Sequence, residues 1–187
     1  MIILKKNKLF IISGHSGSGK TSLMRSLMSN ELISFTTREK RKGEVNGVDY
    51  HFINDQHNTL VYRNKLIEKT FYGGNYYGLT KDEVDSKLKL GHAFAIVDCN
   101  GMQQLKKYYD NCVTIMLHTT KEHAMLQMLK RGDSAHSIES RLSTFNEELS
   151  NKQFYDYCVF NKHGKFEQTR FILNSILQVE MDKMEEF

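Results

Sequence analysis

The chain has no proline and only three cysteines among its 187 residues. An average chain of this length has about nine prolines, and nothing in the sequence explains their absence. Cys99, Cys112 and Cys158 are odd in number and lack C-x-x-C spacing, which excludes a disulfide framework and a zinc site of the usual kind. The eight histidines are scattered without metal-binding spacing. We therefore expect a reducing, cytoplasmic compartment.

Long apolar runs are missing as well. No segment approaches the roughly 20 residues that span a membrane, and residues Met1 to Lys6 lack the apolar region of a signal peptide. We expect no membrane partner. The net charge of +4 is mild, and a nucleic-acid partner would call for a denser basic face. The length and the 40% hydrophobic content suit one globular domain with inserted subregions.

The glycine-rich segment Gly14–Thr21 reads G-x-x-x-x-G-K-T and follows an apolar run. Such a loop between a strand and a helix surrounds a nucleotide polyphosphate with backbone N–H groups. Lys20 is expected to reach the outer phosphates, and the Thr21 hydroxyl to bind Mg²⁺. An ordinary Gly/Ser turn is the alternative, but it would not need the strand-to-helix setting. The residues predicted to bind the nucleoside triphosphate here are Gly14, Ser16, Gly17, Ser18, Gly19, Lys20, Thr21 and Ser22.

Apolar runs alternate with amphipathic segments along most of the chain. Buried strands are predicted at residues 10–12, 93–97, 113–117 and 157–160. Helices are predicted from the glycine-rich loop to about residue 30, from a capping box at Thr80–Glu83, and over 101–109, 121–130, 137–150 and 166–181. This alternation indicates an α/β fold with a mainly parallel sheet covered by helices on both faces.

Residues 34–79 have a different pattern, which predicts a small inserted β-rich subdomain. Asn46-Gly47 is a hairpin turn signal, residues 48–53 alternate as a half-buried strand should, and Gly73-Gly74 and Gly78 interrupt the rest. Arg38 and Arg41 could converge on one anion. Hydroxyls of Ser34, Tyr50 and Tyr77 could join them on a phosphate monoester. Taken alone, however, the charged run would more often be a solvated loop.

These segments together closely resemble the signature of the guanylate kinase family, in the right order from about Leu9 to Leu177. The matching residues are Ser34-x-Thr36-Thr37-Arg38-x-x-Arg41-x-Gly43-Glu44-Val45, Gly47, Tyr50, Phe52, Ile67-Glu68, Gly74-Asn75-Tyr76-Tyr77-Gly78, Ile96-Val97-Asp98, Arg131-Gly132, Arg141-Leu142, Glu147, Tyr155-Asp156-Tyr157 and Asn161.

The resemblance implies one P-loop nucleoside monophosphate kinase domain over residues 1–187. It divides the chain into a core (1–33, 80–118 and 146–187), a nucleoside-monophosphate-binding subdomain (34–79) and a helical lid (119–145). The implied reaction is ATP + GMP = ADP + GDP, a step of purine nucleotide metabolism. ATP and Mg²⁺ are the implied cofactors, GMP is the substrate, and the enzyme would be a monomer or a homodimer.

The resemblance also assigns roles to single residues. The GMP phosphate would be held by Ser34, Arg38, Arg41, Tyr50 and Tyr77, with Glu44 beside it. Glu68 would accept hydrogen bonds from the guanine N1–H and amino group. Asp98 would lie near the phosphates and Mg²⁺, and Asn161 on the ATP side. Positive charge around the transferred group would come from Lys20, Mg²⁺, Arg38, Arg41 and Arg141. Arg131 and Arg141 match lid arginines that close over ATP, with Arg131 near the adenine.

Two departures fall on positions that read the base. Leu79 stands where the family has a Ser or Thr that contacts guanine O6, and Asn100 stands where an aspartate reads the amino edge. A lost neutral hydrogen bond costs about 0.5–1.5 kcal/mol and a charge-assisted one about 1.5–3 kcal/mol. The chain is then either a divergent guanylate kinase with a compensating donor such as Thr80, or a kinase of the same fold with another nucleotide or a ribosyl phosphate as acceptor. A non-catalytic, phosphopeptide-binding relative is a third hypothesis, which the intact Gly14–Thr21 loop disfavours.

Overall fold

The structure is a computed structural model that describes residues 7–53, 65–72 and 74–183. Residues Met1 to Lys6, over which no signal peptide is expected, and Gly73 of the expected glycine break lie outside the described residues. None of the helices in the described ranges is long and apolar enough to cross a membrane.

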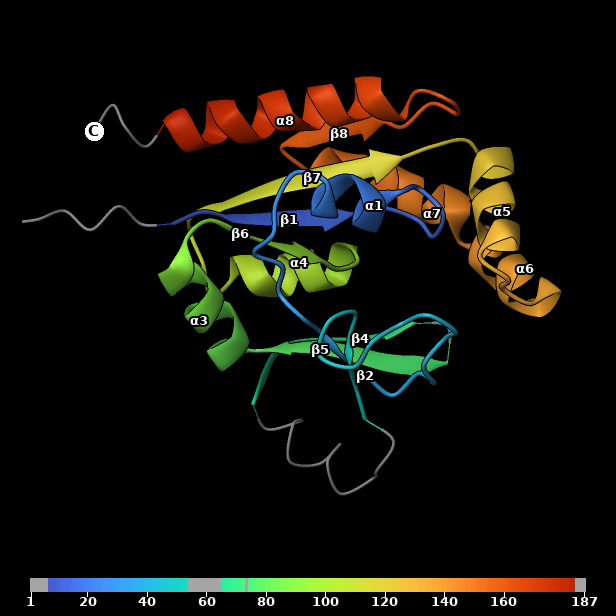
Figure 1. The fold of residues 1–187 in the computed structure, drawn as a ribbon, viewed down its shortest axis with the longest axis horizontal. Coiled ribbons are helices and arrows are strands. Elements are labelled where there is room, and N and C mark those ends of the chain that lie inside the picture. The colour runs from blue at the N-terminus through green and yellow to red at the C-terminus, as the bar shows by residue number, and fades with distance from the viewer. Residues whose placement is uncertain (1–6, 54–64, 73, 184–187) are drawn as a thin grey trace, which may run out of the picture.

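A four-stranded parallel sheet forms the centre of the molecule, in the order β6-β1-β7-β8 (Figure 1). Its strands are β1 (Leu9–Ser13), β6 (Ala93–Ile96), β7 (Cys112–His118) and β8 (Tyr157–Phe160). β1 is buried along its whole length, because it lies between two neighbours and under helices on both faces. The predicted α/β fold with a mainly parallel sheet is confirmed.

Alternate residues of β1 face two separate helical layers. Phe10 and Ile12 pack against α1 (Lys20–Arg25) and α8 (Phe166–Asp182). Leu9 and Ile11 face the opposite layer of α3 (Lys81–Leu90) and α4 (Cys99–Lys106) (Figure 1). Each fully buried side chain of this size contributes about 1.5–3 kcal/mol, so the two layers fix the strand that carries the glycine-rich loop.

A second sheet, in the order β3-β2-β5-β4, lies beyond α3 and α4 (Figure 1). It consists of β2 (Phe35–Thr36), β3 (His51–Phe52), β4 (Leu66–Tyr72) and β5 (Asn75–Thr80). β5 runs directly into α3, whose N-cap Thr80 accepts a hydrogen bond from Glu83 N. Gln104 of α4 exchanges hydrogen bonds of 2.9 and 3.0 Å with the Lys69 backbone. The small sheet is thus attached to the core at two places.

The remaining helices extend the carboxyl edge of the central sheet. They are α5 (Lys121–Lys130), α6 (Ala135–Ser143), α7 (Phe145–Ser150) and the 3₁₀ helix η1 (Asn151–Phe154). α5 and α6 project from the end of the molecule at which β1 and β7 finish (Figure 1). The hydroxyls of Thr120 and Ser134 cap their N-termini, which satisfies backbone donors that a helix cannot pair by itself.

Two predicted helices are too long. The helix after the glycine-rich loop ends at Arg25 instead of about residue 30, where the Ser26 hydroxyl bonds the Leu23 carbonyl at 2.6 Å. The segment predicted as one helix over 137–150 is divided at Thr144 into α6 and α7, and the Thr144 hydroxyl donates to the Arg141 carbonyl at 3.2 Å. In both cases a hydroxyl competes for a backbone acceptor.

The predicted hairpin at Asn46-Gly47 is wrong. β2 and β3 pair in parallel, not antiparallel, and β3 is limited to His51–Phe52. Side chains hold the connecting loop instead: Asp49 accepts from Val45 N at 2.7 Å and Asn46 accepts from Phe52 N at 2.9 Å. The turn signal was therefore outweighed by local side-chain-to-backbone hydrogen bonds.

Glu180 of α8 bonds to residues before β1, in β8 and at the end of α8. These bonds predict that the stability of the fold decreases in acid. Its carboxylate accepts from Lys8 at 3.0 Å, Tyr157 at 2.6 Å and Lys183 at 2.5 Å. Burial alone would raise the Glu180 pKa, but the three hydrogen bonds outweigh it and hold the pKa at about 2. A carboxylate with a lowered pKa stabilises the fold above its ordinary pKa and loses this contribution as the pH falls toward 2.

Glu180→Gln is accordingly expected to lower the free energy of unfolding by about 2 kcal/mol at pH 7, and the deficit should shrink steadily between pH 5 and pH 2. Urea unfolding of both proteins across this range measures the difference. A deficit that is constant with pH would show that the charge of Glu180 does not contribute.

Candidate functional site

A cavity of about 560 Å³ lies at the carboxyl edge of the central sheet, bounded by the glycine-rich loop, the small sheet and the α5–α6 region. It brings together most of the predicted site residues, which come from segments far apart in the chain. These are Gly14, Ser16, Gly17, Gly19, Lys20, Thr21, Ser22, Ser34, Arg38, Arg41, Glu44, Tyr50, Glu68, Tyr77, Asp98, Arg131 and Arg141. Ser18, Leu79, Asn100 and Asn161 do not line it.

The glycine-rich loop is pressed against the backbone of two neighbouring elements. Gly14 has a φ of +133°, and a Cβ there would lie 1.9 Å from the Leu117 carbonyl oxygen of β7. Gly17 has a φ of +80°, and its Cβ would lie 2.4 Å from the Ala124 carbonyl oxygen of α5. Both positions exclude a side chain for two reasons, because L residues also avoid these φ values. The loop conformation therefore depends on glycine.

Lys20 lies at the centre of the loop, and its ammonium group donates to the Gly14 carbonyl and, at 2.9 Å, to the His15 carbonyl. Burial lowers its pKa to about 8, and the positive charges of Arg131 and Arg141 act in the same direction, against the opposing effect of Glu148. The ammonium group is thus under-compensated by protein anions. Such a site attracts phosphate oxygens.

Asn161 supports the loop from behind. Its amide donates to the Ser18 carbonyl at 2.9 Å and its oxygen accepts from Thr169 at 3.0 Å. Both Asn161 and Ser18 are buried and lie outside the cavity lining. In this structure Asn161 therefore holds the glycine-rich loop from outside the cavity, and nucleotide binding by Ser18 and Asn161 stays a prediction.

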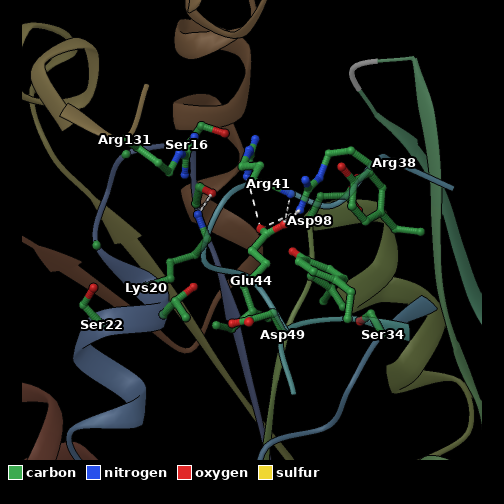
Figure 2. A pocket seen from close by; sticks show the side chains of 18 of the residues that line it. Ser16, Lys20, Ser22, Ser34, Arg38, Arg41, Glu44, Asp49, Asp98 and Arg131 are labelled. Carbon is green, nitrogen blue, oxygen red and sulfur yellow. Dashed lines mark hydrogen bonds and ion pairs between the residues drawn. The ribbon is translucent and has the colours of Figure 1, made fainter. Parts of the chain in front are cut away.

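On the opposite side of the cavity, Glu44 bonds both Arg38 and Arg41. Its carboxylate accepts from Arg38 at 2.7 and 3.0 Å and from the Arg41 backbone N–H at 2.8 Å. Figure 2 shows Glu44 between the two arginines, with Lys20 on the other side of the pocket. One carboxylate thus holds the Arg38 guanidinium and the Arg41 backbone, and it lies 3.7 Å from the Arg41 guanidinium.

Arg38 also packs against aromatic rings. The Arg38 guanidinium lies 5.4 Å from the centroid of the Tyr50 ring, and the Tyr50 and Tyr77 rings meet edge to face at 5.8 Å. Burial raises the pKa of the Tyr50 phenol, which keeps it a neutral hydrogen-bond donor. Burial together with the charges of Arg131 and Arg38 lowers the Arg41 pKa. The clamp therefore retains excess positive potential suited to a phosphate dianion.

The lid arginines connect the two sides of the cavity. Arg131 of the α5–α6 connection pairs with Asp133 at an Nε–Oδ1 distance of 3.1 Å, and the same Asp133 oxygen lies 3.7 Å from Arg41 Nε. Arg141 of α6 donates to the Ser16 hydroxyl of the loop. Residues of the α5–α6 region thus contact both the glycine-rich loop and Arg41 on the opposite side of the cavity.

Glu68 and Asp98 form the acidic end of the cavity. Glu68 is only 2% exposed, and burial together with the charge of Asp98 raises its pKa to about 8. Asp98 caps α4 by accepting from Gly101 N at 2.7 Å and also accepts from the Thr70 hydroxyl at 3.1 Å. Two carboxyl groups therefore share a poorly solvated place, which favours ligands that bring N–H donors.

Leu79 and Asn100, the two departures from the family pattern, lie outside the cavity lining. Leu79 is fully buried and packs with Leu9 and Val84 in the core. Asn100 is an exposed residue of α4. Neither side chain lines the cavity, so these departures do not alter its surface directly.

Several cavity residues were missed by the sequence prediction. Thr70 follows Glu68 by two positions on β4, a spacing that puts both on one face. Arg25 lies one helical turn after Thr21 and bonds Glu31 at 2.5 Å and Asp49 at 2.7 Å. These periodicities could have indicated both residues. Glu148 also lines the cavity, and burial raises its pKa; no local pattern distinguishes it from Glu147.

A parallel α/β sheet, a G-x-x-x-x-G-K-T loop at its carboxyl edge and a second anion clamp facing that loop define a P-loop phosphotransferase with two phosphate subsites. The family model described as guanylate kinase matches residues 6–180. The guanylate kinase of Rickettsia prowazekii is 35% identical over 189 residues, covering 95% of each chain. That of Shewanella denitrificans is 33% identical over 182 residues, covering 92% of this chain and 87% of its own.

A solved structure agrees with the sequence matches. The crystal structure of guanylate kinase from Anaplasma phagocytophilum superposes with a TM-score of 0.73 and 25% identity, covering 93% of this chain and 86% of that one. The chain belongs to the guanylate kinase family.

The position of Leu79 leads to a test of its role. Leu79→Thr should lower the free energy of unfolding by about 3 kcal/mol, because it removes apolar volume and buries a hydroxyl, and it should not sharpen discrimination among nucleoside monophosphates. Leu105→Thr, in the same buried cluster, is the matched control and should cost a similar amount. Thermal melts and competition between nucleotides measure the two effects. A stable Leu79→Thr protein with sharper base selection would place this side chain at the base after all.

Proposed function

We propose that this chain transfers the terminal phosphoryl group of ATP to GMP, giving ADP and GDP. The observation that carries the proposal is one cavity with three parts: the Lys20 loop, the Arg38–Glu44–Arg41 clamp facing it, and the buried carboxyl of Glu68. Membership of the guanylate kinase family supports the same reaction.

The donor side has the chemistry that ATP and Mg²⁺ require. Positive-φ glycines bring the backbone of the loop close to a polyphosphate, and Lys20 and Arg141 supply positive charge to it. The exposed Thr21 hydroxyl lines the same cavity and is a hard oxygen ligand of the kind Mg²⁺ prefers. When bound, Mg²⁺ would neutralise phosphate charge and help to orient the phosphates.

The acceptor side would hold GMP by its two ends. Arg38, Arg41 and the hydroxyls of Ser34, Tyr50 and Tyr77 would bind the phosphate, and Glu44 would keep the arginines in place. Glu68, in its ionised form, would accept from the guanine N1–H and amino group. A bound donor edge favours that ionised form and so lowers the raised Glu68 pKa on binding.

The chemistry needs alignment more than acid–base catalysis. A phosphate monoester is largely ionised near neutral pH because its second pKa is about 6, so the attacking oxygen needs no general base. Lys20, Arg38, Arg41 and Arg141 would compensate the charge of the transferred group, and lid closure through Arg131 and Arg141 would exclude water. Leu79 and Asn100 lie outside the cavity and so give no support to a different acceptor.

The reaction is tested by ADP release from ATP and Mg²⁺ with GMP, dGMP, AMP, IMP, CMP, UMP and ribose phosphates as acceptors. GMP should be the best substrate of the panel. Lys20→Ala should lose nearly all turnover, since a charge that acts mainly in the transition state affects kcat. Activity with none of the acceptors, or undiminished activity of Lys20→Ala, would overturn the proposal.

Arg38→Ala separates the two substrate sites. Loss of a charge-assisted contact should raise the KM for GMP roughly 10- to 100-fold while the affinity for ATP changes by less than about threefold. Arg170, a half-buried arginine of α8 paired with Glu167 at 2.9 Å, provides the matched control as Arg170→Ala and should leave both parameters unchanged. Steady-state kinetics and ATP binding measure the effects; equal losses for both substrates would remove Arg38 from the acceptor site.

A further inference from the structure

Thr70 lies at the acidic end of the cavity without a role in the reaction as described so far. It follows Glu68 by two residues on β4, so that both side chains share one face of the small sheet. Both line the cavity and both are largely buried, with exposed fractions of 9% for Thr70 and 2% for Glu68. A buried hydroxyl next to a buried carboxyl is placed to order its neighbours.

The Thr70 hydroxyl contacts both carboxyl groups: it hydrogen-bonds Glu68 on its own strand and reaches across to the core to hold Asp98. Its Oγ1 donates to Asp98 Oδ1 at 3.1 Å, and Gly101 N donates to the same oxygen at 2.7 Å. Within the described part of the chain, the hydrogen bonds to Asp98 therefore converge on Oδ1, which leaves Oδ2 available to a ligand. The Thr70 contact determines which way that second oxygen faces.

Gly101 allows the two carboxyl groups to approach each other. A Cβ at Gly101 would lie 2.7 Å from Glu68 Oε1, so the first turn of α4, which Asp98 caps, packs directly on the Glu68 carboxyl. No lysine or arginine of the described residues forms an ion pair with Glu68 or Asp98 in this structure. Two adjacent acceptors without a basic partner are best satisfied by a ligand with two adjacent N–H donors.

The purine bases differ in the hydrogen-bond donors that they present at N1 and at the 2-position. Guanine presents N1–H and a 2-amino group side by side. Hypoxanthine keeps N1–H but lacks the amino group, and adenine presents an acceptor at N1. A site built to pair with a ligand N–H rejects the analogue that lacks it, because the protein acceptor is then left unpaired.

We propose that Thr70 determines base specificity by holding Asp98 beside Glu68, so that Asp98 reads the 2-amino group of the acceptor base. This inference rests on the proposed function. It transfers to Asp98 the role that the resemblance places at the position of Asn100, whose side chain is exposed and outside the cavity. Thr70 acts through Asp98 and is therefore a positioning residue.

The test compares GMP with IMP, which differ only in the 2-amino group. Thr70→Val removes the hydroxyl and keeps the shape of the side chain. The ratio of kcat/KM for GMP to that for IMP should fall about tenfold, through loss of GMP activity with little change for IMP. Thr70→Ser should restore the wild-type ratio. Calorimetric binding of GMP and IMP without ATP should show the same change. An unchanged ratio in Thr70→Val would overturn the inference.

Three control variants separate base reading from structural damage. Thr114→Val removes another buried hydroxyl bonded to an aspartate, Asp156 at 2.7 Å, outside the cavity lining; it should lower stability and keep the ratio. Asn100→Ala should also keep the ratio. Asp98→Asn should lower it, whereas an equal loss on GMP and IMP with a higher Mg²⁺ requirement would assign Asp98 to the metal and overturn the inference.

The kinetics of the wild-type protein separate a failure of the proposed function from a failure of the role given to Thr70. Wild-type protein that does not prefer GMP to IMP would overturn the inference together with the proposed function. Wild-type protein that prefers GMP, combined with a Thr70→Val protein of equal preference, would overturn only the role of Thr70.

Discussion

Repulsion among cationic side chains is the constraint on which the arrangement of the cavity depends. Its lining gathers Lys20, Arg38, Arg41, Arg131 and Arg141. Two unit charges 4 Å apart interact by about 4 kcal/mol at the effective dielectric constant near a protein surface, so these groups must be held together by acids. Glu44 spaces two of the arginines, and Asp133 pairs with a third. Burial and, after it, the charges of neighbouring arginines nevertheless lower the pKa values of Lys20 and Arg41, so these cations are neither well solvated nor fully paired. A phosphate group would complete the pairing.

The fold supplies the rigidity that this arrangement needs. Parallel strands bring the ends of β1, β6 and β7 to one edge of the sheet, where Lys20 and Asp98 follow two of them. The loop cannot relax away from its charges, because Gly14 and Gly17 pack against the backbone of β7 and α5 and Asn161 holds the Ser18 carbonyl. The acceptor clamp, in contrast, belongs to a small sheet tied to the core through α3 and α4. The positive charges of the cavity thus come from two places: the fixed loop of the central sheet and the clamp on the attached small sheet.

The sequence predicted correctly those features that depend on residues close together in the chain. The glycine-rich loop, the α/β alternation and the pair Arg38 and Arg41 each depend on local spacing. The structure brings the loop and the two arginines to one cavity. The predictions failed where tertiary contacts decide. The turn signal at Asn46-Gly47 was outweighed by hydrogen bonds of Asp49 and Asn46. Hydroxyls shortened or divided two helices.

The roles of single residues also divide into those that local spacing predicts and those that tertiary contacts decide. Asn161 matches a residue of the family pattern, but the structure buries it behind the loop. This burial depends on α8, and no local sequence pattern predicts where α8 packs. Leu79 was assigned to the base from its place after Tyr77-Gly78, yet packing against Leu9 and Val84 directs it into the core. Thr70 was detectable in principle from its two-residue spacing to Glu68. Its partner Asp98 is 28 residues away, so the contact itself was not.

The two ends of the acceptor site have opposite electrostatic character, and this polarity selects an orientation before any single contact forms. Arg38 stacks on Tyr50, Tyr50 meets Tyr77, and Tyr77 pairs in register with Thr70 on the neighbouring strand. The two tyrosines therefore connect a cationic end to an acidic one. A nucleotide with an anionic phosphate and a donor-rich base edge matches both ends in one orientation only. Reversal would put phosphate against Glu68 and Asp98. A base that offers an acceptor there would face the same repulsion in milder form, so the charge pattern favours guanine over adenine as well as fixing the direction of entry.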